Sequence, residues 1–504
     1  MASDAVGSER VSRVVGYKIA KGDFRSSSPN LPQRIVLLGE ANTANQGTLD
    51  TDPFQITSAQ QAGQRYGYGS PLHLQARILL PKGGGGIGGI PVIAIPQTEA
   101  VGATAKILEV SATGTATKNG THTLVVAGRE GYDGNFYNIP VVIGDSTDEI
   151  STKITDAINN MLACPFTAID ADYNSQLTSK WKGATADKLF VTVNTNGDDL
   201  GLTYTVDEVS SAAGQPSIAD ALDAIGNDWV TIIENPYEST QIMQALEIFN
   251  GIPDPVNPTG RFVGIVMKPF IAITGNTDED PSAITDARAN DVTIAIAPAP
   301  LSAGLPMEAA ANMVVLFAVI SQNNPHLDVA GQPYPDMPAP VSIGAMADYN
   351  NRDLFVKRGC STVTLETGRY IVQDFVTTYH PTGEEPPQYR YPRNLMLDFN
   401  VRYGYLLLEQ INVVDHAIAA DEDTVTASKV IKPKMWIQIL NSYAKDLAKR
   451  GLIVQVGFMA DSIKVGLSTS NPDRLETEFS YKRSGFARIS ATTATAGFNF
   501  GTLE

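Results

Sequence analysis

The chain has 504 residues, of which 43 % are hydrophobic and 18 % are charged, and its formal net charge is −17. This composition is typical of packed globular domains and excludes a disordered protein. An acidic surface repels phosphate backbones, which argues against nucleic acid as a partner. The opening residues lack the apolar stretch of a secretory signal. The apolar run at 313–320 is too short for a bilayer, which takes about 20 residues. We therefore expect synthesis in a cytoplasm and no membrane insertion.

Cys164 and Cys360 are the two cysteines of the chain. Thiols stay reduced in a cytoplasm, so two buried free thiols are expected. A disulfide between them is the alternative.

Residues 1–32 show little hydrophobic periodicity and are predicted to form an extended N-terminal arm. Between positions 10 and 25 this arm carries five basic residues and one acidic residue, Asp23. Its apolar stretch VVGYKIA (14–20) is predicted to be one short strand.

Residues 33–103 and 211–345 alternate apolar runs with helical patterns. The alternation predicts one discontinuous α/β domain built on a mainly parallel sheet. Capping signals support the helices: Thr57, Ser70 with Pro71 in the first turn, and Gly251 as a stop. The predicted strands are 34–40, 90–96, 228–234, 261–267 and 292–298, and the predicted helices are 57–67, 70–80, 239–251, 282–290 and 306–320.

Residues 104–210 differ in composition, because Thr, Gly, Ala and Val alternate along them. This pattern predicts an inserted β-rich domain at an exposed loop, where an insertion breaks few contacts. Lys-Asn-Gly-Thr at 118–121 is typical of a hairpin turn between two strands. The predicted helix is 151–163, and further strands are expected at 188–195 and 202–209.

Residues 346–484 are predicted to form an α+β C-terminal domain, followed by a C-terminal arm at 485–504. We expect an antiparallel hairpin over 360–379 and a long helix over 393–418. A second helix is predicted at 433–451, where Pro lies near the start and Gly just past the end. Residues 479–501 have a β-like pattern and end in an aromatic-rich tail.

No stretch of the sequence specifies an active site, a metal site or a cofactor. The glycine run 83–89 lies between a helix and a strand, whereas a dinucleotide loop needs strand, glycines and then helix. The five histidines lack metal-ligand spacing. DADYNS (170–175) copies the start of a calcium loop, but Ser175 and Trp181 replace its required Gly and Glu. We therefore predict a protein that is not an enzyme.

The predicted helix 433–451 has an apolar face at helical spacing, which includes Trp436, Leu440 and Leu447. Positions 429–450 carry six basic residues and one acid, Asp446. One interpretation is a solvated face whose last residues complement the C-terminal end of the helix dipole. The other is a basic strip that docks on an acidic partner, and its residues would be Lys445, Lys449 and Arg450.

The order of these segments resembles the tail sheath proteins of contractile-tailed bacteriophages, and in particular their Mu-like branch. The resemblance is carried by VLLGE (36–40), ITSAQQAGQRYGYGSPLH (56–73), IPVIAIP (90–96), ATGTATKNGTHTLVVAG (112–128) and VTIIENPYEST (230–240). It is good over about 33–300 and looser beyond, and it rests on the order and spacing of several motifs.

The resemblance implies a structural subunit that forms stacked hexameric rings around a tail tube and contracts to drive the tube through the host envelope. Implied partners are copies of itself, the tube protein, and baseplate and tail terminator proteins. The subunit would belong to the virion and be assembled in the host cytoplasm. The inserted domain would project outward.

The resemblance also implies that the two arms add strands to the sheet of a neighbouring subunit, which suits segments that fit no predicted core. The residues expected in these contacts are Val14, Val15, Tyr17, Ile19, Phe486, Arg488 and Ile489. Two alternatives stay open. One is the sheath of a contractile injection particle other than a phage. The other is a cytoplasmic α/β enzyme with a lid-like insertion and a ligand at the carboxyl ends of its parallel strands.

Overall fold

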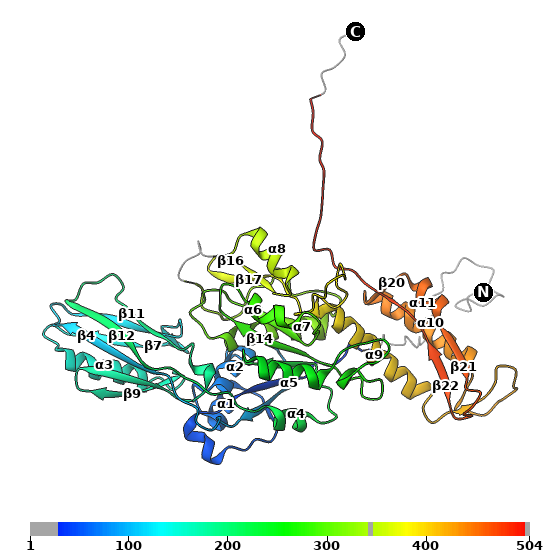
Figure 1. Cartoon of the computed structure of the whole chain (residues 1–504), viewed down its shortest axis with the longest axis horizontal. Coiled ribbons are helices and arrows are strands. Elements are labelled where there is room, and N and C mark those ends of the chain that lie inside the picture. The colour runs from blue at the N-terminus through cyan, green and yellow to red at the C-terminus, as the bar shows by residue number, and fades with distance from the viewer. Residues whose placement is uncertain (1–28, 341–345, 499–504) are drawn as a thin grey trace, which may run out of the picture.

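A computed structural model describes residues 29–340 and 346–498. The strand predicted at 14–20 lies outside these residues. The described chain is elongated (Figure 1): the inserted residues form one end and the large sheet lies in the middle. The other end is formed by α9 (Pro392–Asn412), α10 (Pro433–Lys449), α11 (Val456–Ser462), β21 (Lys464–Leu467) and β22 (Leu475–Glu478).

The centre of the molecule is a six-stranded sheet in the order β15-β14-β13-β1-β3-β2. Neighbouring strands run parallel except for β2 at the edge, which is antiparallel to β3. The mainly parallel sheet is therefore confirmed. Its strands are β1 (Ile35–Glu40), β2 (Phe54–Ile56), β3 (Val92–Gln97), β13 (Ile232–Asn235), β14 (Ile271–Asn276) and β15 (Ile294–Pro298).

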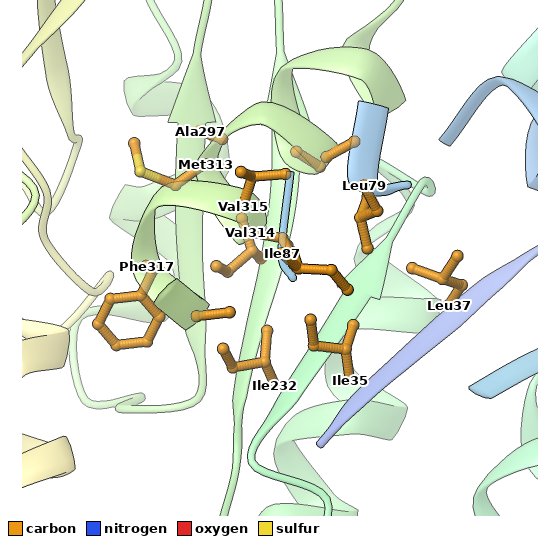
Figure 2. Packing of buried hydrophobic residues seen from close by; sticks show 14 of the residues in the cluster. Ile35, Leu37, Leu79, Ile87, Ile232, Ala297, Met313, Val314, Val315 and Phe317 are labelled. Carbon is orange, nitrogen blue, oxygen red and sulfur yellow. The ribbon is translucent and has the colours of Figure 1, made fainter. Parts of the chain in front are cut away.

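Helices cover both faces of this sheet, which explains why its strands are apolar without alternation. Ile35 and Leu37 belong to one buried cluster, while Val36 and Leu38 belong to another on the opposite face. Figure 2 shows the first cluster, in which strand residues such as Ile232 gather with residues of α7. The first face is covered by α1 (Ala59–Tyr66), α2 (Pro71–Leu79) and α7 (Pro306–Asn323), and the second by α4 (Ala219–Ile225) and α5 (Thr240–Asn250).

Local capping chemistry sets several helix ends. Ser70 accepts a hydrogen bond from the backbone N–H of His73, with Pro71 in the first turn, as predicted. The cap of α1 is Ser58, which accepts from the N–H of Gln61, so the prediction of Thr57 was off by one residue. Gly251 ends α5 with a φ of 77°, a conformation that favours glycine.

The strand predicted at 261–267 is wrong. The chain instead forms the short 3-10 helix η3 (Gly260–Phe262) and turns, and the next sheet strand is β14. Arg261 is only 5 % exposed, and its guanidinium donates to the backbone carbonyls of Gly226, Asp228 and Lys268. Two of these carbonyls belong to residues that are distant in sequence, and the third lies in irregular backbone. The apolar pattern of 261–267 therefore could not predict that this segment is a loop. The helix predicted at 282–290 is split into α6 (Ser282–Thr285) and η4 (Asp286–Arg288).

The residues between β3 and β13 form separate sheets with their own buried cluster, which includes Trp181. One sheet has the order β12-β4-β10-β9 and the other β11-β5-β8. The hairpin predicted around 118–121 is therefore wrong, because β4 and β5 belong to different sheets. The elements are β4 (Ile107–Gly114), β5 (Gly120–Val126), β6 (Gly131–Tyr132), β7 (Asn135–Phe136), β8 (Asn138–Val141), α3 (Thr147–Asn159), β9 (Phe166–Ala171), β10 (Asn174–Ser179), η2 (Ala184–Ala186), β11 (Val191–Asn194) and β12 (Leu202–Ser210).

After residue 346 the hairpin β16–β17 is antiparallel, as predicted, and it packs with the start of α9 into the first sheet cluster. The long helix predicted to reach 418 ends at Asn412. The β-like pattern at 479–501 is wrong for most of its described length: β23 is two residues long, and 484–498 form no helix or strand. The elements are α8 (Tyr349–Lys357), β16 (Thr362–Glu366), β17 (Arg369–Asp374), α9 (Pro392–Asn412), β18 (Ala417–Ile418), β19 (Val430–Ile431), α10 (Pro433–Lys449), β20 (Ile453–Val454), α11 (Val456–Ser462), β21 (Lys464–Leu467), β22 (Leu475–Glu478) and β23 (Lys482–Arg483).

Candidate assembly interfaces

The histidines and cysteines have structural surroundings. His73 is buried and its Nδ1 accepts from the N–H of Gly69 at 3.0 Å, and burial lowers its pKa to about 3. His122 is buried and lies 2.9 Å from the hydroxyl of Tyr204. Cys164 and Cys360 are buried free thiols, as predicted. In the part of the chain that the structure describes, no cluster of His, Cys, Asp and Glu could hold a metal ion, and no helix is long and apolar enough to span a membrane.

The carboxyl ends of the parallel strands, where doubly wound sheets bind ligands, are covered by inserted residues. Glu40 ends β1 and is 1 % exposed, and its Oε1 accepts from the hydroxyl of Thr185 at 3.1 Å. The indole N–H of Trp181 donates to the same hydroxyl at 2.9 Å. Burial raises the pKa of Glu40 to about 7. A cavity of about 210 Å³ remains beside Thr185. Lys188 lines this cavity, and its ammonium group forms an ion pair with Asp278 at 3.0 Å.

Helix α10 buries the apolar face that its sequence predicts. Trp436, Leu440 and Leu447 are each at most 1 % exposed. The indole N–H of Trp436 donates to the hydroxyl of Thr477 at 3.1 Å, and the hydroxyl of Tyr443 donates to the carbonyl of Val401 at 2.6 Å. The helix is thereby fixed against α9 and β22.

The three basic residues at the end of α10 have different surroundings. Lys445 and Lys449 are exposed. Arg450 donates to Oδ1 of Asn30 at 2.6 Å and lies 3.6 Å from the carboxylate of Asp446, and its side chain is 13 % exposed. Arg450 is thus engaged by its own chain, and the open basic surface of the predicted strip consists of Lys445 and Lys449.

The predicted C-terminal arm does not leave the body at residue 485. Arg488 is ion-paired with Asp328 and lies 3.6 Å from the carboxylate of Asp374, and Phe486 lies beneath the guanidinium of Arg393 at 5.6 Å. Ile489 is 89 % exposed. From about this point the chain runs away from the body (Figure 1). The residues Val14, Val15, Tyr17 and Ile19 lie outside the described residues.

A second candidate surface is the small sheet of β21 and β22, which sequence analysis missed. Within the described ranges the two strands pair only with each other, so each has an unpaired outer edge. Val465 and Leu475 pack onto the cluster around Trp436. The alternation in LETE (475–478) was a weak signal for a strand, because four residues fit several local structures.

These features define a mixed α/β protein whose prominent surfaces are a basic helix, a two-stranded sheet and an extended C-terminal segment. No known family profile matches the chain. The chain is 23 % identical over 460 residues to the Mu-like prophage FluMu tail sheath protein of Haemophilus influenzae, which covers 89 % of this chain and 90 % of that protein. The resemblance to the Mu-like tail sheath proteins is thereby confirmed, and it extends beyond residues 33–300.

The comparison with solved structures gave matches of lower sequence identity. A sheath tail protein from Desulfitobacterium hafniense is 10 % identical with a TM-score of 0.43, over 94 % of this chain and all of that one. The contracted helical sheath of the anti-feeding prophage is 9 % identical with a TM-score of 0.48, over 97 % of this chain and all of that one.

Proposed function

We propose that this protein is the sheath subunit of a contractile phage tail, which polymerises as stacked hexameric rings around a tail tube and contracts to drive the tube through the host envelope. The observation that carries the proposal is the similarity to a Mu-like tail sheath protein over about nine-tenths of both chains. Contraction is then a change between two arrangements of subunit interfaces. Its energy is stored in subunit packing and needs no nucleotide.

The arms would link subunits by adding strands to a neighbour's sheet. The sheet of β21 and β22 is the acceptor that we propose, because a two-stranded sheet is marginally stable alone and each added strand would pair one of its two open edges. The donors are the N-terminal arm and the residues from Ile489 onward. Residues 104–210 would project from the outer surface of the polymer.

The basic end of α10 would face the tube. Lys445 and Lys449 are exposed at the end of a helix whose opposite face is fixed in the body. On a chain with a net charge of −17, an exposed basic pair is suited to an acidic partner surface. Further partners would be the baseplate and tail terminator proteins.

The first test is negative-stain electron microscopy of the purified full-length chain, together with analytical sedimentation. We expect rings or tubes, either from the chain alone or after the cognate tube and baseplate proteins are supplied. A small, sharply sedimenting particle that stays small with those partners present would overturn the proposal. In that case nucleotide soaks would test the α/β enzyme instead.

A further inference from the structure

After β23 the C-terminal segment returns to the domain that contains the six-stranded sheet, which we call the sheet domain. Asp328 lies in the loop that follows α7, and Asp374 is the last residue of β17. The guanidinium of Arg488 is ion-paired with Asp328, lies 3.6 Å from the carboxylate of Asp374 and stacks 3.6 Å from the ring centre of Tyr391. The side chains of Arg488 and Asp328 are 14 % and 3 % exposed. The contact is therefore a largely buried ion pair between the end of the chain and the sheet domain.

A second arginine holds the residues just before this contact. Arg393 in the first turn of α9 donates to the carbonyl and to the hydroxyl of Ser484, both at 2.9 Å. It also donates to the carbonyl of His326 at 2.7 Å. The loop 326–328 is thus bonded to Arg393 and Arg488 alike. The two arginines fasten residues 484–488 to one short loop behind α7.

The energetics of such a contact favour a fixed attachment. A buried ion pair adds little stability relative to apolar residues, but removal of one partner leaves an uncompensated buried charge. A planar guanidinium that is stacked on a ring and paired with two carboxylates also has a defined orientation, which lysine cannot reproduce. The attachment therefore fixes both the position and the direction of the chain at Arg488.

We propose that Arg488 is the anchor that fastens the C-terminal arm to the sheet domain. A pulling force on the arm would then pass to the loop that follows α7 and to β17. It would bypass the elements from α10 to β22, which precede the arm in sequence. The part of the arm available to a neighbour then begins at Ile489. The anchoring itself stands on intramolecular contacts. Its role in transmitting force rests on the proposed sheath function.

The test is hydrogen–deuterium exchange of the full-length isolated subunit. We expect Arg488→Ala to raise exchange at least about tenfold in peptides covering 326–332 and 484–490, since the anchor's loss frees both sides. Arg488→Lys should give a smaller rise, because it keeps the charge but loses the stacked fork. The matched control is Arg358→Ala, which removes a more exposed ion pair with Asp286 and should leave both peptides unchanged.

Wild-type exchange at 326–332 in Arg488→Ala would overturn the anchor. If Arg488→Ala does not fold, Arg488→Lys decides in the same way. Polymerisation is then followed by electron microscopy with tube and baseplate proteins present. If the wild type forms regular polymers and Arg488→Ala forms irregular ones, the role of the anchor in transmitting force is supported. If both form equally regular polymers, that role is refuted. A wild type that never assembles refutes the sheath function, while the exchange data still decide the anchor.

Discussion

Glu40 ends the central strand β1 with a carboxyl group that is 1 % exposed and contacts inserted residues through Thr185. Desolvation raises its pKa from 4.5 to about 7, and Glu99 adds to the rise while hydrogen bonding, including that from Thr185, opposes it. The folded pKa lies above the unfolded one, so the folded state binds more protons between these values. Its contribution to stability is complete below about pH 4.5 and is lost as the pH rises to about 7.

We expect Glu40→Gln to remove this pH dependence, because the amide keeps the shape of the protonated carboxyl without ionising. The difference between the two pKa values corresponds to about 3 kcal/mol. The unfolding midpoints of the wild type and of Glu40→Gln are measured by denaturation between pH 4 and 8. As the pH rises to about 7, the midpoint of the wild type should fall relative to that of the variant. Above about pH 7 the difference between the two midpoints should stay constant. Glu366→Gln, at the exposed end of β16, is the control. Parallel curves over the whole range would show that folding does not raise the pKa of Glu40.

At the scale of elements, α10 shows how one helix serves both packing and a surface. Its apolar side chains, led by Trp436 and Leu440, fix it in the C-terminal unit. Lys445 and Lys449 are exposed among its last five residues. Two roles are compatible with these lysines: complementing the helix dipole and docking on an acidic surface. The first acts within the subunit and the second between proteins, so an experiment can separate them.

We expect the double substitution Lys445→Glu and Lys449→Glu to weaken association with the tube protein by about tenfold or more, because each reversal replaces attraction by repulsion. Polymerisation without the tube should be unchanged, and the loss should shrink at high salt. Co-sedimentation with the tube protein measures the effect. Lys82→Glu with Lys118→Glu, two exposed lysines elsewhere, is the control of equal charge. Wild-type co-assembly of the α10 variant would leave only the dipole interpretation.

At the scale of the whole molecule, the C-terminal segment projects from an otherwise packed body (Figure 1). No helix or strand forms over 484–498. Residues 484–488 are held against the sheet domain by Arg393 and Arg488, and the segment that projects begins at Ile489. Removal of the residues from Ile489 onward should therefore leave the fold intact. A truncation that begins at 489 therefore tests the projecting segment alone, whereas one that begins at 485 would also remove the anchor.

We expect deletion of 489–504, and separately of 1–25, to abolish polymerisation while circular dichroism and thermal unfolding stay close to those of the full chain. The reason is that strand addition between subunits relies on main-chain hydrogen bonds from these segments. Electron microscopy and sedimentation measure the outcome. A deletion from 485 should in addition expose the loop 326–328. Normal polymers from both truncated chains would refute the linkage by arms.

The sequence by itself determined the features that depend on neighbouring residues. Strand β1 follows from a continuous apolar run, and α2 follows from Ser70 and Pro71 at its start. The face of α10 follows from helical spacing, and the family resemblance follows from ordered motifs. Each of these signals lies within a few residues along the chain, where periodicity and capping act.

Only the tertiary structure decided which segments meet. It placed β4 and β5 in different sheets, turned the apolar run at 261–267 into a loop held by Arg261, and paired Arg488 with Asp328, 160 residues away. It also buried Glu40 beneath inserted residues. Strand pairing, burial and buried ion pairs depend on groups that are distant in sequence, and a local pattern carries no information about those partners.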